Sequence, residues 1–225
     1  MEFVNWIRNA GLEYFVQFRE ACYLDIVREF YTNLDIVYDS DIPRSLSSRV
    51  EGYNVELSIE QFRGLFQIPS AGARAFYRES DLNFGDVDSR EGDPLLNVFR
   101  DITIGNTIPR VSSRDYPSRE LGFQEYLAHR AIIKVVLPLL STTDSLSLYQ
   151  AFYIYALKHT VPVDFAAAIL AHMSYVLSHP KCGLPYGHII THLLRHLPIA
   201  FPKTSLPVNC TYALAVLYHL SIKGS

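Results

Sequence analysis

LPYGHIITHLLRHL, at residues 184–197, is the stretch on which the predicted architecture depends. Its apolar residues recur every three or four positions, which is typical of an amphipathic helix packed against a core. Pro185 stands where a first helical turn accepts proline, and Pro198 ends the pattern. The apolar stripe consists of Tyr186, Ile189, Ile190, Leu193, Leu194 and Leu197. We therefore expect one side of this helix to be buried and the other to be polar.

The polar side carries three histidines and an arginine, namely His188, His192, Arg195 and His196. The simplest interpretation is a solvated helix face. The alternative is a surface that faces nucleic acid, because histidine gains charge below about pH 6.5.

A metal site is a second hypothesis for the same region, because His179, Cys182, His188 and His192 are residue types that bind zinc. The link between Cys182 and His188 has only five residues, against about twelve in zinc fingers. These four residues are weak candidates, and we predict no metal and no cofactor.

Composition indicates an ordinary globular protein of 225 residues, with 49% hydrophobic and 19% charged residues. The charges are unevenly distributed. Residues 1–120 contain 20 acidic and 13 basic residues, whereas residues 121–225 contain three acidic and seven basic residues and all eight histidines. A mildly basic second half could face an acidic partner or the acidic first half, and pairing within the chain is the simpler prediction.

Three distant cysteines favour a reducing compartment, and no signal-peptide pattern opens the chain. The longest apolar runs are interrupted by charged residues or proline before they reach the roughly 20 residues that cross a bilayer. We expect an intracellular protein of the nucleus or cytoplasm, neither secreted nor membrane-spanning.

The first half of the chain predicts a long helix over residues 12–37, a β-hairpin over 46–57 and a short helix after it. Ser58 and Gln61 form a capping-box pattern at the start of that short helix, which ends before Pro69. Residues 70–119 lose periodicity and are expected to be mostly loop, with a short helix or strand near 95–104.

Helical patterns return from residue 120 and cover 123–140, 146–157, 162–177, 186–197 and 212–222. We predict a mainly α, multi-helix domain with one small β-hairpin in its N-terminal half. The domain would span residues 1–225, either as one unit or as two subdomains, 1–69 and 120–222, joined by the irregular segment 70–119.

No catalytic constellation emerges from the sequence. It lacks Gly-x-Ser-x-Gly, a phosphate-binding loop and a dinucleotide fingerprint. Its aromatic residues do not alternate with Lys and Arg as single-strand-binding platforms require. We therefore predict that the protein is not an enzyme, and the sequence identifies no small-molecule substrate.

Several motifs, in their order, resemble a plant family known as the putative plant transposon protein domain, found in retroelement-derived reading frames. The resemblance covers roughly residues 14–200, and a second group, the plant mobile domain, shares the hairpin and helix less closely. The motifs are VREFYTNL at 27–34, VEGYNVELS at 50–58, FQIP at 66–69, LYQAFYIY at 148–155 and LPYGHIIT at 184–191. The family implies an origin in a mobile element and supplies no catalytic residues.

These observations favour a non-catalytic module that binds another protein or associates with itself. The alternative is a nucleic-acid-binding, capsid-like or DNA-associated protein of a retroelement, with the four residues of the histidine face as its contact surface.

Overall fold

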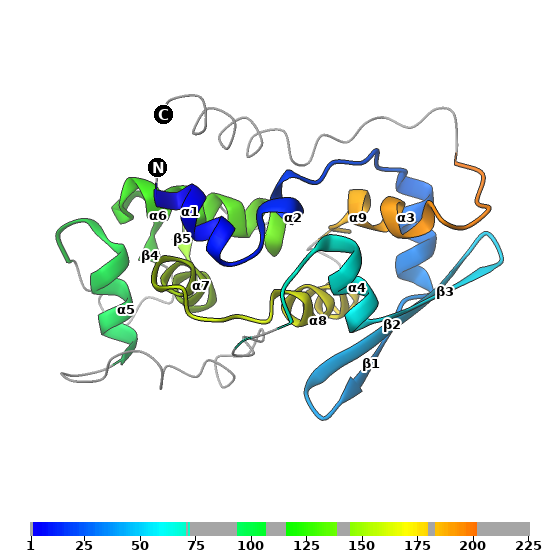
Figure 1. Ribbon diagram of the computed structural model, residues 1–225, viewed down its shortest axis with the longest axis horizontal. Coiled ribbons are helices and arrows are strands. Elements are labelled where there is room, and N and C mark those ends of the chain that lie inside the picture. The colour runs from blue at the N-terminus through cyan, green and yellow to red at the C-terminus, as the bar shows by residue number, and fades with distance from the viewer. Residues whose placement is uncertain are drawn as a thin grey trace.

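The computed structural model describes residues 2–70, 72, 94–106, 116–138, 145–179 and 183–201 (Figure 1). The predicted helix at 212–222 lies outside these residues. Of the described residues, 56% are helical and 17% are in strands, and they include a three-stranded antiparallel sheet, so the fold is α+β. The predicted class, mainly α with one small hairpin, is wrong because it omitted the first strand of that sheet.

The predicted long helix at 12–37 is divided into three elements. Helix α1 (Glu2–Asn9) precedes α2 (Glu13–Gln17), α3 (Leu24–Thr32) and strand β1 (Asp35–Asp39). Extended backbone at Phe18 ends α2. Asn33 ends α3, where its side-chain amide donates to the carbonyls of Glu29 and Arg49. The β-branched Ile36 and Val37 then pair with β2, and this non-local pairing outweighs the helical spacing of the sequence.

The sheet has the order β1-β2-β3, with β2 at Ile42–Val50 and β3 at Tyr53–Ser58. Glu51 and Gly52 join β2 to β3 with φ values of 48° and 83°, which is the type I′ turn that suits the twist of a hairpin. The predicted hairpin is thus confirmed. One sheet face is buried through Ile36, Leu46 and Val55, whereas the other is largely exposed.

Helix α4 (Ile59–Phe66) begins directly after β3, as its capping box predicts. Ser58 accepts a hydrogen bond from the Gln61 amide at 3.2 Å, and the Gln61 side chain accepts one from the Ser58 amide at 2.8 Å. Each bond satisfies a backbone donor that the first helical turn would otherwise leave unpaired.

The C-terminal part consists mainly of helices and includes a short two-stranded pairing of β4 with β5. Helix α8 is almost wholly buried, and Ala166, Ala167 and Ala168 let its neighbours approach closely. The elements are α5 (Pro94–Ile102), η3 (Ile104–Asn106), β4 (Tyr116–Pro117), η4 (Ser118–Glu120), α6 (Phe123–Ala131), η5 (Ile132–Val136), β5 (Ser145–Leu146), α7 (Leu148–His159), α8 (Phe165–Leu177) and α9 (Gly187–Leu194).

Figure 1 shows α8 in the middle of the molecule, between the sheet with α3, α4 and α9 on one side and α1, α5, α6 and α7 on the other. Helix α8 contacts β1, β2 and α4, α3 contacts α9, and α1 contacts α6 and α7. Buried side chains from both predicted subdomains, 1–69 and 120–222, form one continuous hydrophobic core. Whether the two segments unfold separately stays a prediction. None of the helices in the described segments combines the length and the apolar character needed to cross a membrane.

Candidate functional site

Helix α9, predicted from the LPYGHIIT stretch, is fixed in place by the residues at its start. Tyr186, with a φ of 62°, is buried, and its hydroxyl donates to the Val136 carbonyl at 2.8 Å. That hydroxyl also accepts from Nδ1 of His172 at 2.7 Å, because its own proton is committed to Val136. Burial lowers the pKa of His172 to about 3, so the ring is neutral. The start of α9 is therefore held by core hydrogen bonds.

A close approach to α3 and its preceding loop explains the glycine of the same motif. A Cβ atom on Gly187 would lie 2.2 Å from Sγ of Cys22, far inside van der Waals contact. The Tyr31 hydroxyl also donates to the Pro185 carbonyl at 3.0 Å. Only glycine lets α9 pack this tightly here.

The first two histidines of the predicted polar face point toward the protein. His188 is 8% exposed, and its buried Nε2 has no hydrogen-bond partner among the described residues. Burial lowers the pKa of His188 to about 4. The His192 ring packs edge-on against Phe18 at 4.7 Å between centroids, and burial is the main cause of its lowered pKa. Both rings are thus engaged in packing, and the His188 ring is neutral at pH 7.

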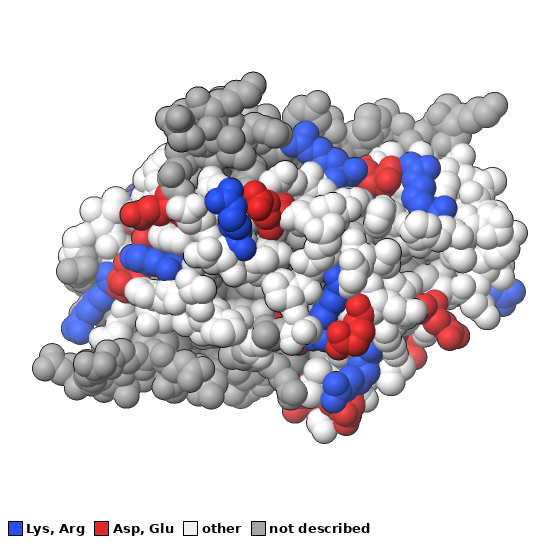
Figure 2. Space-filling view, viewed as in Figure 1, with Lys and Arg blue, Asp and Glu red and all other residues white. Residues whose placement is uncertain are grey.

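Arg195 and His196 lie at the surface. Nη2 of Arg195 contacts a carboxylate oxygen of Glu20 at 2.6 Å, and this hydrogen bond lowers the pKa of Glu20. The Arg195 guanidinium also lies 4.8 Å from the centre of the Phe201 ring. His196 is exposed beside a groove described below. Figure 2 shows acidic and basic side chains interspersed on the face in view.

The four weak metal candidates are placed as follows. His179 follows α8, and its exposed ring stacks on Tyr175 at 3.8 Å between centroids. His188 and His192 pack as above, and Cys182 lies outside the described residues. Within the described ranges, no group of three or more His, Cys, Asp or Glu side chains is arranged to hold a metal ion.

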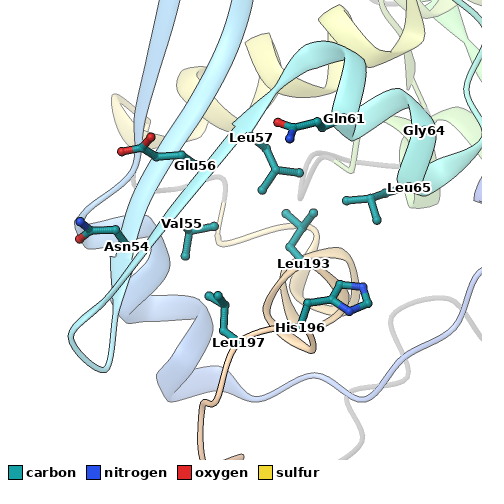
Figure 3. Close-up of a pocket in the computed structure, with 10 residues that line it drawn as sticks. All are labelled: Asn54, Val55, Glu56, Leu57, Gln61, Gly64, Leu65, Leu193, His196 and Leu197. Carbon is teal, nitrogen blue, oxygen red and sulfur yellow. The ribbon is translucent and has the colours of Figure 1, made fainter.

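An open groove of about 520 Å³ lies between β3, α4 and the end of α9 (Figure 3). Val55 and Leu57 reach it from β3, Leu65 from α4, and Leu193 from α9. Figure 3 shows these side chains directed toward the centre of the groove. Its lining residues are Asn54, Val55, Glu56, Leu57, Gln61, Gly64, Leu65, Leu193, His196 and Leu197.

The apolar lining and polar rim of the groove suit the binding of a ligand. Its walls are mostly aliphatic, and polar groups stand at its rim, as is common for sites that bind peptides or small ligands. Gly64 has no side chain, and a Cβ atom added there would meet nothing within 4 Å, so the space beside it is empty. The groove is therefore open on the α4 side.

The sequence patterns predicted some of the residues that line this groove. The stripe of the 184–197 helix includes Leu193 and Leu197, and the alternation of Val55 and Leu57 was recognised as a strand. Nothing in the periodicity brings these two elements together. Gly64, an exposed glycine inside a helix that alanine would stabilise, is the one local signal that could have drawn attention to α4.

The model of one protein family, described as "Putative plant retrotransposon-related domain", matches residues 8–199 of the chain. This match confirms the resemblance to retroelement-derived plant proteins. No curated protein and no solved structure matches the chain.

Proposed function

Because the chain belongs to the family of plant retrotransposon-related domains, we propose that it is a non-catalytic protein-interaction module whose binding surface is the groove between β3, α4 and α9. The observation that carries this proposal is the aliphatic lining of an open groove with a volume of about 520 Å³. Burying such apolar surface on a partner is favourable by about 25 cal/mol per Å². Aliphatic side chains of a partner would gain this free energy in the groove, and the cost of association must be met by further contacts along the bound segment.

The alternative partner, nucleic acid, requires a basic surface. His188 is buried and neutral, His192 packs on Phe18, and Arg195 is paired with Glu20. The predicted contact surface thus offers little free positive charge. The proposed setting is inside the cell, in the nucleus or cytoplasm, because three cysteines that lie far apart in the sequence favour a reducing compartment.

The test uses the full chain and a phage-displayed library of random twelve-residue peptides. Enriched peptides are synthesised, and their affinities are measured by fluorescence polarisation. We expect micromolar binding that Gly64→Trp weakens at least tenfold, because the indole would fill the open side of the groove. Gly64→Ala is the matched control and should bind within twofold of the parent protein.

Both substitutions should leave the melting temperature unchanged or slightly raised, because Gly64 is an exposed helical glycine with free space around it. The proposal fails if no peptide is enriched, or if the enriched peptides bind the Gly64→Trp protein as tightly as the parent. Sedimentation velocity on both proteins tests self-association: a dimer dissociated by Gly64→Trp would make the groove the dimer contact. A dimer that persists in that variant would place self-association elsewhere.

A further inference from the structure

The free edge of β3 runs along the groove. Strand β3 stands at the end of the order β1-β2-β3, so only one of its edges pairs with another strand of the sheet. Asn54 and Glu56 line the groove, yet Figure 3 shows their side chains directed away from its centre. These two residues therefore line the groove with their main chain.

The turn geometry determines which main-chain groups face outward. In a hairpin closed by a two-residue type I′ turn, the residues that flank the turn form a hydrogen-bonded pair, which here is Val50 with Tyr53. Hydrogen-bonded and non-hydrogen-bonded pairs alternate along an antiparallel ladder. Val55 and Leu57 consequently bond to β2, whereas the N–H and C=O groups of Asn54 and Glu56 point away from it.

An independent contact supports this alternation of inward and outward main-chain groups along β3. Ser58 lies two residues beyond Glu56, and its backbone N–H points away from β2. It donates to the Gln61 side chain of the capping box at 2.8 Å. For Asn54 and Glu56, by contrast, no hydrogen bond to these outward groups is found within the described ranges, and both residues are exposed. Within the part of the chain that the structure describes, two donors and two acceptors thus stand unpaired along one wall of an apolar groove.

Such an edge binds an extended segment by adding a strand, with main-chain hydrogen bonds for affinity and alternate side chains for specificity. Every second side chain of an added strand would enter the groove toward Leu193 and Leu65. The intervening side chains would lie on the exposed sheet face, beside Glu56. Glu56 has no ion-pair partner in the part of the chain that the structure describes.

Resting on the proposed function, we infer that the ligand of the groove is an extended peptide segment of another protein that pairs with β3 as a fourth strand. Its aliphatic side chains alternate with polar ones, and a lysine or arginine stands beside Glu56. Opposite charges on neighbouring strands attract, so this position selects against an acidic residue.

The first test methylates the backbone nitrogens of one enriched peptide, one residue at a time. Strand addition predicts an alternating result: methylation at every second residue abolishes measurable binding, and methylation at the residues between leaves affinity within about threefold. A dependence with three- or four-residue spacing, or no dependence on position, would overturn the strand and indicate a helical or side-chain-only ligand.

The second test alters the protein. Asn54→Pro removes the outward N–H but no bond of the β2–β3 ladder, so the fold should persist and peptide affinity should fall at least tenfold. Asn54→Ala keeps the N–H and should therefore bind the peptide more tightly than Asn54→Pro. Amide exchange followed by NMR should show protection of Asn54 and Glu56 upon peptide addition. If these amides stay unprotected while Gly64→Trp abolishes binding, the added strand is refuted. The groove would then remain the binding surface.

The charge prediction has its own readout. Glu56→Lys should reverse the preference at the neighbouring peptide position from lysine or arginine to aspartate or glutamate when the library selection is repeated. An unchanged preference would show that Glu56 does not contact the ligand. If residues 202–225 of the same chain occupied the groove, a protein truncated after Phe201 would bind the peptide at least tenfold more tightly than the full chain, and the assignment to another protein would fall.

Discussion

The ion pair of Arg63 with Asp164 joins the N-terminal sheet unit to the C-terminal helices. Nη2 of Arg63, in α4, lies 2.6 Å from Oδ2 of Asp164, and both side chains are only 11% exposed. Asp164 also caps α8 by accepting the Ala167 amide at 3.0 Å. Glu60, the other carboxylate beside Arg63, is largely exposed. We predict that Asp164→Asn substantially destabilises the whole fold.

The expected cost follows from the burial of the pair. Removing one partner of a buried ion pair typically costs about 3–5 kcal/mol, because the other charge is left without compensation. Glu60 offsets part of this loss, and asparagine still caps the helix, so we expect about 3 kcal/mol. For a chain of this size, that corresponds to a decrease of roughly 6–12 °C in melting temperature.

Urea unfolding of the full chain, followed by circular dichroism and by Trp6 fluorescence, measures this cost. Trp6 reports on α1, which contacts α6 and α7, whereas circular dichroism reports on all helices. The two probes should give the same midpoint before and after substitution, as expected for one cooperative unit. The control is Asp39→Asn, which breaks the exposed pair with Arg44 and should cost less than about 1 kcal/mol.

A loss below about 1 kcal/mol for Asp164→Asn would refute the assignment of this pair as a structural link. Two separate transitions in the parent protein would support the predicted subdomains, 1–69 and 120–222, and argue against one cooperative unit. The Arg63→Met, Asp164→Asn double variant separates pairing from burial, because it removes both charges while asparagine still caps α8, and it should recover most of the stability lost in Asp164→Asn.

Three further predictions concern the packing of α9, the buried His188 and two helix caps. Gly187→Ala should cost about 1–3 kcal/mol in chemical unfolding through its clash with Sγ of Cys22, and Cys22→Ala in the same protein should recover part of that loss. The free energy of unfolding should fall as the pH decreases from 6.5 to about 4, because burial lowers the pKa of His188 to about 4 and the unfolded chain therefore binds that proton first. His188→Gln should reduce the dependence of the unfolding free energy on pH by up to about 1.4 kcal/mol per pH unit. An unchanged dependence would contradict the burial of a neutral His188. Ser58→Ala and Ser147→Ala should each cost about 1 kcal/mol, because both serines form complete capping boxes; losses confined to one of them would show that the other box contributes nothing.

Local chemistry in the sequence determined several elements. The reciprocal bonds of Ser58 and Gln61 involve residues three apart, so they could be predicted without any tertiary information. The hairpin at 46–57 and the buried stripe of α9 likewise follow from alternation and helical spacing. The family could be recognised from the order of short motifs, and the match over residues 8–199 confirms it.

Tertiary contacts decided the rest. Residues 12–37 have helical periodicity throughout, yet Phe18 leaves the helix to pack on Phe66 and His192, and Ile36 enters a sheet whose other strands lie further along the chain. Periodicity records which side chains are apolar, but it does not record which partner buries them. For the same reason His188 and His192, whose positions predicted a solvated helix face, pack against Phe18, which lies more than a hundred positions away in the sequence. The groove arises only where β3, α4 and α9 meet, and spacing within any one of them could not reveal it.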